Sequence, residues 1–212
     1  IKNTYQSLED EVLPILINKK KICGSLTRCK FIDIGTKKNY KIAKKKFFKR
    51  KKALFLDRDG VINKDKGYVH KMKDLKWTKN IFSSLKYANK NFDHIFIITN
   101  QSGIGRGIYT EDQFINFQKK IKNIFLKKKI YIDEVYYCPH HPIHGIKKYK
   151  IKCKCRKPQN LMVEKAVNDW FIDRKKSLMI GDNLSDEICA KKSNIKFAYK
   201  EFNFLKQLKS FK

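Results

Sequence analysis

Short apolar runs alternate with helix-like stretches from residue 53 onward, and this alternation constrains the fold more than any other feature. Strands are expected at five of these runs, namely ALFLD (53–57), HIFIIT (94–99), DEVYYC (133–138), SLMIGD (177–182) and IKFAYK (195–200). Helices are expected between and after them, over 79–91, 110–128, 160–172 and 184–193. This order predicts an α/β fold, an open parallel sheet with helices on both faces. Ligands of such sheets bind at the carboxyl ends of the strands.

The first expected strand ends in two carboxylates whose spacing suits phosphate chemistry. Asp57 and Asp59 lie two residues apart in LFLDRDGVIN (54–63), so an extended segment points both side chains to the same side. One carboxylate can attack phosphorus while the other handles a proton. A D-x-D pair also occurs in ordinary turns with solvated acids, so this motif needs support from the rest of the chain.

Two later strands end in residues that suit the same chemistry. TNQSGIGRG (99–107) offers the Thr99 hydroxyl and glycines that let backbone N–H groups approach an anion. Asp182, in GDNLSD (181–186), is a candidate cation ligand, and Lys157 supplies a positive charge. The order of these motifs, each placed after an apolar run, favours one joint phosphate site over three unrelated loops.

The segment CPHHPIHGIKKYKIKCKC (138–155) concentrates cysteine and histidine. Its C-x-H and C-x-C pairs, in a chain whose other cysteines are dispersed, favour a metal site in a reducing compartment over a disulfide framework. No helix with an H-x₃₋₅-H pair follows, which excludes a nucleic-acid-binding finger of that type. A reduced, metal-free loop is the alternative.

The chain is strongly basic, with 50 Lys and Arg against 20 Asp and Glu and a formal net charge of +30. Such an excess fits nucleic acid or an acidic membrane surface. Lys far exceeds Arg, however, and the lysines are scattered, whereas base readers and phosphate clamps usually favour Arg. Nucleic acid is therefore the less favoured partner. No apolar run is long enough to span a membrane, and no signal peptide is visible, so a cytoplasmic protein is expected.

The order DRDGVIN (57–63), ITNQSG (98–103), KP and GDNLSD resembles the haloacid dehalogenase superfamily of aspartyl phosphotransferases. Within it, GYVHKMKDLKW (67–77), YYCPHHP (136–142) and CKCRKP (153–158) resemble the heptose-1,7-bisphosphate 7-phosphatases. The resemblance covers residues 53 to 200. It implies a Rossmann-like, haloacid dehalogenase-like sheet with a zinc-stapled loop.

The resemblance also implies roles for the carboxylates. Asp57 would be the nucleophile that forms an aspartyl-phosphate, and Asp59 would protonate the leaving oxygen and then activate water. Mg²⁺ would be held by the Asp57 carboxylate, the Asp59 backbone carbonyl and Asp182, and would neutralise charge between the reacting anions.

Further residues are assigned to the substrate by the same resemblance. Thr99 and Lys157 would bind the oxygens of the transferring phosphoryl group, and Asn100 and Arg156 would contact the rest of the substrate. The chain departs from the family pattern at Asn183, where many members carry Lys, and this removes a possible phosphate contact.

The resemblance places Zn²⁺ on one set of four ligands: Cys138, His140, Cys153 and Cys155. Four soft or borderline ligands with no open position describe a structural site. His141 and His144 are alternative ligands, although solvated loop histidines are the simpler interpretation for them. Arg156 and Lys157 follow the last cysteine directly, so the metal would fix two residues that meet the substrate.

The first fifty residues need a separate interpretation. FIDIGT (31–36) resembles the C-terminal end of sugar-phosphate nucleotidyltransferases, where the acid matching Asp33 would help to hold a metal. KKNYKIAKKKFFKRKK (37–52) indicates a basic amphipathic helix running into a linker. We therefore expect a nucleotidyltransferase remnant with a basic linker over 1–50 and a phosphatase domain over 51–212, as in a truncated fusion protein. An unrelated helical extension is the alternative.

Together these resemblances imply a Mg²⁺-dependent, zinc-containing phosphatase that removes the 7-phosphate of D-glycero-D-manno-heptose 1,7-bisphosphate. The product would feed nucleotide-activated heptose for lipopolysaccharide or other surface polysaccharide. A fused nucleotidyltransferase of this type is associated with the GDP-activated route, which predicts the α-anomer as substrate. The alternatives are a histidinol-phosphate phosphatase, a basic nucleic-acid-binding protein and a DNA 3′-phosphatase.

Overall fold

The computed structural model describes residues 7–24, 31–47 and 49–211. The chain divides into two compact units, Ile1–Lys45 and Lys46–Lys212, which are described here one at a time. This division lies a few residues before the predicted domain boundary between 50 and 51. None of the helices in the described part of the chain combines the length and the apolar character needed to cross a membrane.

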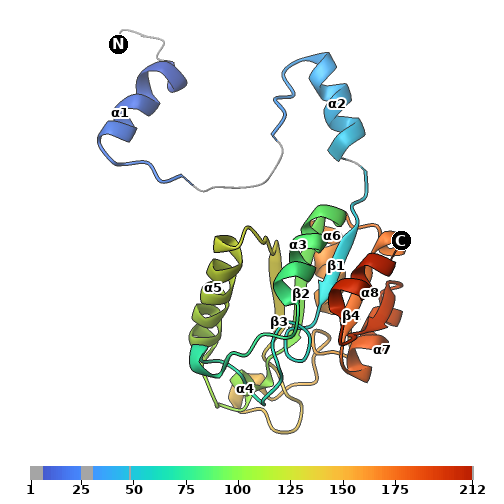
Figure 1. The fold of residues 1–212 in the computed structure, drawn as a ribbon. Helices are drawn as coiled ribbons and strands as arrows, with labels where there is room; N and C mark the ends of the chain where they lie inside the picture. The colour runs from blue at the N-terminus through green and yellow to red at the C-terminus, as the bar shows by residue number, and fades with distance from the viewer. Residues whose placement is uncertain (1–6, 25–30, 48, 212) are drawn as a thin grey trace. The chain divides into compact units, whose positions relative to one another are not determined.

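The first unit contains short helices (Figure 1). A π-helical turn, Leu8–Val12, is capped by the Ser7 side chain and runs directly into α1, Leu13–Asn18. Helix α2, Lys37–Phe47, carries lysines and no acidic residue. The sequence 37–52 was expected to form a basic helix running into a linker, and residues 49–52, after the helix, are indeed not helical. Cys29 lies outside the described residues.

The second unit is built on a five-stranded parallel sheet, as predicted. Its strands are β1 Ala53–Leu56, β2 His94–Asn100, β3 Glu134–Cys138, β4 Leu178–Gly181 and β5 Lys196–Tyr199. The spatial order is β3-β2-β1-β4-β5, and every neighbouring pair is parallel. The chain thus moves outward from β1 on one side and from β4 on the other. The carboxyl ends of β1 and β4 adjoin at this switch point, where ligands of open α/β sheets bind.

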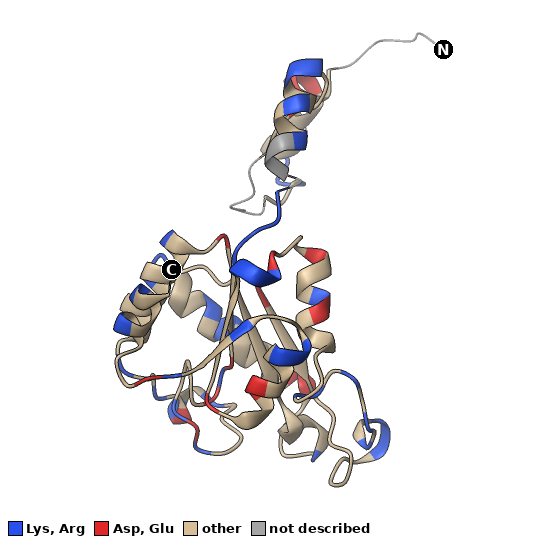
Figure 2. Ribbon diagram, turned by 90° about the vertical axis from the view of Figure 1, so that its right-hand side faces the viewer, with Lys and Arg blue, Asp and Glu red and all other residues tan. Residues whose placement is uncertain are grey.

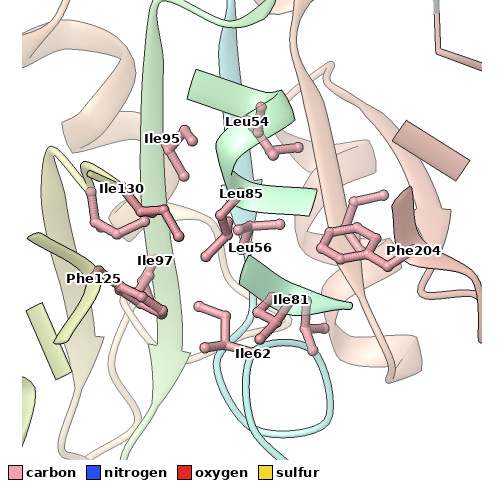
Figure 3. Packing of buried hydrophobic residues seen from close by; sticks show 14 of the residues in the cluster. Leu54, Leu56, Ile62, Ile81, Leu85, Ile95, Ile97, Phe125, Ile130 and Phe204 are labelled. Atoms are coloured by element: carbon pink, nitrogen blue, oxygen red, sulfur yellow. The ribbon is translucent and has the colours of Figure 1, made fainter. Parts of the chain in front are cut away.

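Helices cover both faces of the sheet, and alternate strand residues face one layer or the other. Leu54 and Leu56 pack with α3 (Ile81–Asn91), α5 (Glu111–Lys127) and α8 (Phe204–Ser210). Figure 3 shows Leu85 of α3 and Phe125 of α5 meeting the sheet residues of this cluster.

The opposite face packs against two further helices. Ala53 and Phe55 of β1 contact residues of α6 (Leu161–Asp169) and α7 (Leu184–Lys192). The remaining elements are short: α4 Ser102–Gly105 and the 3₁₀ turns Met72–Asp74, Lys147–Tyr149 and Arg174–Lys176. These short turns lie in the connections between the main elements of the unit.

Capping boxes in the local sequence fix the starts of two helices in the second unit. Thr110 and Gln113 form a capping box at the start of α5. Asn183 and Asp186 form another at the start of α7. Because α7 begins directly after β4, its capping residues are held at the carboxyl edge of the sheet.

Candidate active site

A cavity of about 560 Å³ opens at the carboxyl ends of β1, β2 and β4. Its lining includes all seven residues that the sequence assigns to phosphate chemistry: Asp57, Asp59, Thr99, Asn100, Arg156, Lys157 and Asp182. Residues more than a hundred positions apart in the chain are thus brought to one site.

The turn after β1 fits closely against the turn after β4. Asp57 donates its N–H to the carbonyl of Ile180, with an N···O distance of 3.0 Å. Gly60 has a φ of +82°, and a Cβ at this position would overlap the Asp182 carboxylate. The glycine of the DRDG motif therefore provides both the left-handed turn and the room for Asp182 to face Asp57.

Lys157 is the buried cation of the site. Its Nζ lies 2.7 Å from Asp57 Oδ1, 2.8 Å from the carbonyl oxygen of Ile98 and 2.5 Å from Asp186 Oδ1. Burial by itself lowers the pKa of Lys157, but the charges of Asp57 and Asp186 outweigh it and hold the pKa above its ordinary value. The three donors of the ammonium group therefore all have partners.

Asp57 is the most perturbed carboxylate. Burial raises its pKa to about 7 against the opposing charge of Lys157, and the charge of Asp186 adds to the increase. A buried acid with a pKa near neutrality, next to a cation and other carboxylates, is typical of a functional site.

Asp57, Asp182 and Asp186 form a cluster of carboxylates, in which one oxygen from each lies within 4.8 Å of the others. Burial and the charge of Asp186 raise the pKa of Asp182, so a cation placed among these oxygens would relieve their repulsion. Oxygen donors of this kind fit Mg²⁺. Sequence reasoning selected Asp182 and missed Asp186, although both belong to GDNLSD and lie four residues apart.

The Asp59 carboxylate points its oxygens at other partners. Arg58 Nη2 donates to Oδ2 at 2.6 Å, Asn63 Nδ2 donates to Oδ1 at 2.8 Å, and Gln101 Nε2 donates to Oδ2 at 3.3 Å. The Arg58 side chain is itself buried, with its guanidinium over the rings of two phenylalanines. These three residues were not singled out from the sequence, and together they fix the orientation of Asp59.

Asn100 orders the loop that carries Lys157. Its Oδ1 accepts the Lys157 N–H at 3.0 Å, and its Nδ2 donates to the Lys157 carbonyl at 3.1 Å. Thr99 Oγ1 accepts from Gln101 Nε2 at 2.8 Å, and Tyr109 in turn donates its hydroxyl to Gln101 Oε1 at 2.6 Å. The second strand end thus contributes one residue that positions Lys157 and one hydroxyl that faces the cavity.

The four residues assigned to zinc also come together: Cys138, His140, Cys153 and Cys155 each offer one ligand atom within 4.8 Å of the others. Sulfur–sulfur distances are 3.0 to 3.5 Å, and His140 Nδ1 lies 3.3 Å from the sulfur of Cys155. The hydrogen bond between Cys155 and Cys138 lowers the pKa of Cys155 to about 5, which favours a thiolate. Three sulfurs and one imidazole nitrogen are a donor set that fits Zn²⁺.

The other two histidines of this loop are outside that group. His141 Nδ1 accepts backbone N–H groups from Ile143 and His144. Partial burial, followed by the positive charges of Arg156 and Arg106, lowers the pKa of His141. Arg156 Nη1 donates to the His140 carbonyl at 3.4 Å, so the cysteine–histidine cluster directly adjoins a residue of the cavity.

The first unit shows no comparable cluster among its described residues. Asp33 accepts the N–H of Gly35 at 2.9 Å, which is a local turn contact. The metal-binding role expected for Asp33, and the nucleotidyltransferase origin of this unit, stay predictions.

Basic residues are distributed over the molecule. Figure 2 shows Lys and Arg on helices and on connecting loops, separated by other residues. This distribution matches the scattered lysines of the sequence and differs from a single basic stripe.

Comparison with known proteins identifies relatives. A family model described as polynucleotide kinase 3 phosphatase matches residues 52–209. A D-glycero-alpha-D-manno-heptose-1,7-bisphosphate 7-phosphatase from Campylobacter jejuni is 46% identical over 135 residues, which are 64% of this chain and 73% of the relative. The corresponding beta-type enzyme from Vibrio cholerae is 39% identical over 145 residues, 68% of this chain and 78% of the relative.

A solved structure of a named phosphatase has a similar fold. The D,D-heptose 1,7-bisphosphate phosphatase from B. bronchiseptica, complexed with magnesium and phosphate, superimposes with a TM-score of 0.60 at 25% identity. The match covers 70% of this chain and 78% of that one. The family model matches residues 52–209, which are more than half of the chain and contain every residue of the cavity. The chain therefore belongs to the polynucleotide kinase 3 phosphatase family and is a phosphoric monoester hydrolase.

Proposed function

We propose that this phosphatase removes the 7-phosphate of D-glycero-D-manno-heptose 1,7-bisphosphate. The observation that carries the proposal is the 46% identity to a relative named for that reaction, in a chain whose cavity gathers Asp57, Asp59 and Lys157. The proposed reaction proceeds through an aspartyl-phosphate on Asp57, formed by attack of its carboxylate on the phosphorus.

The geometry supports separate roles for the two acids. Lys157 holds Oδ1 of Asp57, which leaves the other oxygen for the attack. Asp59 gives a proton to the leaving sugar oxygen and then takes one from the water that opens the intermediate. Arg58, Asn63 and Gln101 fix the Asp59 carboxylate, so the proton is handled at one position in both steps.

The phosphoryl group itself needs positive charge and hydrogen-bond donors. In this proposal Lys157 provides the charge, and the Thr99 hydroxyl, which lines the cavity, donates to a phosphoryl oxygen. Asn100 keeps Lys157 in place through two hydrogen bonds to its backbone. Arg156 faces the cavity and is assigned to the sugar part of the substrate.

Mg²⁺ is the proposed cofactor of this site. Asp57, Asp182, Asp186 and the backbone carbonyl of Asp59 would hold it, of which three carboxylates already converge in the structure. The ion supplies charge neutralisation between the attacking carboxylate and the phosphoryl group. Lys157 contacts two of the same carboxylates, Asp57 and Asp186, and offsets part of their charge.

Zn²⁺ is proposed for the cysteine–histidine cluster in a structural role. All four ligands come from the loop and strand that lead to Arg156 and Lys157, so the metal would stabilise the position of these two side chains. A closed set of four protein ligands leaves no position for catalysis.

We further propose the α-anomer as substrate, in a cytoplasmic route to nucleotide-activated heptose for surface polysaccharide. The relative named for the alpha compound is 46% identical and the one named for the beta compound 39%. Fusion to a sugar nucleotidyltransferase through the first unit remains part of this proposal. The three cysteines of the metal cluster form no disulfide bonds, which agrees with a reducing compartment.

Two other substrates deserve direct comparison. Histidinol phosphate shares the chemistry of a phosphate monoester, and a DNA 3′-phosphate is favoured by the description of the matched family and by the net charge of +30. The test is a panel of heptose 1,7-bisphosphate, histidinol phosphate and a nicked duplex with a 3′-phosphate, measured as phosphate release with Mg²⁺.

The proposal predicts the highest kcat/KM for the heptose bisphosphate, and no turnover of any substrate by the Asp57→Asn variant. A higher kcat/KM for histidinol phosphate or for the DNA end would replace the proposed substrate. Near-normal turnover by Asp57→Asn would instead remove the aspartyl-phosphate mechanism while leaving the substrate assignment standing.

A further inference from the structure

Arg106 joins three loops behind Tyr68, a residue of the cavity wall, and has no assigned role. It follows α4 directly, its Cζ lies 5.8 Å from the centroid of the Tyr68 ring, and its Nη2 lies 3.1 Å from His141 Nε2. Tyr68 lines the cavity, and a guanidinium over such a ring is held in place by a cation–π contact. Arg106 is therefore a positioned cation beside the substrate site.

The contact between Arg106 and His141 joins two donors. His141 Nδ1 accepts the N–H of His144 at 3.0 Å and that of Ile143 at 3.3 Å, so this nitrogen carries no proton. A neutral imidazole then carries its proton on Nε2, and Arg106 has donors only. Two N–H groups facing each other repel, and the arrangement is relieved when an acceptor oxygen binds to both.

A second observation also indicates an anion. Arg106 Nε is buried and has no hydrogen-bond partner among the described residues. Arg156, which lines the cavity, donates to the carbonyl of His140, the residue before His141. Two arginines thus flank the same short segment, and a guanidinium group binds phosphate through two parallel hydrogen bonds.

We propose that Arg106 and His141 bind the second phosphate of the substrate, the one that is not hydrolysed, through Arg106 Nε and Nη2 and His141 Nε2. This inference rests on the proposed function, since it requires a substrate with two phosphates. It assigns the preference for a sugar bisphosphate over a sugar monophosphate to residues outside the reacting centre.

The test compares heptose 1,7-bisphosphate with heptose 7-phosphate in three proteins: wild type, Arg106→Gln and the control Lys120→Gln. The control removes one charge from an exposed position of α5. Arg106→Gln is expected to lower kcat/KM for the bisphosphate about 10- to 100-fold, as for the loss of hydrogen bonds to a charged group, and to leave the monophosphate nearly unchanged. The Ki of heptose 1-phosphate, measured as a competitive inhibitor, should rise by a similar factor.

Arg106→Lys, which keeps the charge and loses the planar fork, should lie between the wild type and Arg106→Gln. Equal losses on both substrates, or an unchanged Ki for heptose 1-phosphate, would show that Arg106 only supports the loops and would overturn the inference. A wild type that does not prefer the bisphosphate would instead overturn the proposed function, and the inference with it.

Discussion

Replacing Lys157 by Met should destabilise the metal-free protein strongly, because the substitution leaves two buried carboxylates without their cation. Lys157 is only 4% exposed and contacts both Asp57 and Asp186. Removing one partner of a buried charge pair costs about 3–5 kcal/mol. Both carboxylates line the cavity and water can reach them once the side chain is shortened, so we expect a value near 3 kcal/mol.

The assay is urea unfolding in EDTA and in excess Mg²⁺, with Lys120→Met as the matched control at an exposed position of α5. Mg²⁺ should recover part of the lost stability, because a divalent cation replaces the missing positive charge. Turnover should remain at least about 100-fold below wild type even with Mg²⁺, since the fixed positive charge proposed to stabilise the phosphoryl group is lost. A loss of stability in EDTA no larger than that of the control would refute the assigned role of the buried lysine.

The remaining predictions concern pH, zinc and the sugar. Because burial raises the pKa of Asp57 from 3.8 to about 7, the folded protein keeps a proton that the unfolded chain releases, so metal-free stability should fall as pH rises across this window. Denaturation in EDTA at both ends of the window checks the sign, and a rise would contradict it. Cys155→Ser should lose bound zinc, unfold at a lower temperature and raise KM more than it lowers kcat. Elemental analysis, thermal unfolding and steady-state kinetics measure these effects. If elemental analysis finds no zinc in purified wild-type protein, the zinc site is wrong. The α-anomer of the bisphosphate should have a kcat/KM about 10- to 200-fold above the β-anomer, equivalent to ~1–3 kcal/mol, and equal values would remove that preference.

The centre of the sheet was predictable from the sequence because its strands are buried on both faces and therefore appear as continuous apolar runs. ALFL (53–56) and LMIG (178–181) are fully buried in the structure. Helix α8 was missed, although Phe204 and Leu208 lie on one face and are buried. Its stability comes from packing in the same cluster as α3, a tertiary contact that a local pattern does not show.

The carboxylates at the strand ends were found because the fold class predicts where strand ends meet. Asp186 was missed because its importance comes from its ion pair with Lys157, which is distant in sequence. Arg58 was missed for a similar reason. An arginine in a loop is ordinarily exposed, and only the structure shows it buried against Phe114 and Phe117 with its donors on Asp59.

The proposed reaction removes one particular phosphate of a sugar bisphosphate, the 7-phosphate. The most direct measurement follows D-glycero-α-D-manno-heptose 1,7-bisphosphate by ³¹P NMR during turnover with Mg²⁺. We predict that the 7-phosphate signal disappears as inorganic phosphate accumulates in equal amount, while the 1-phosphate signal remains. Loss of the 1-phosphate first, or no change in either signal with active-site residues intact, would contradict this account.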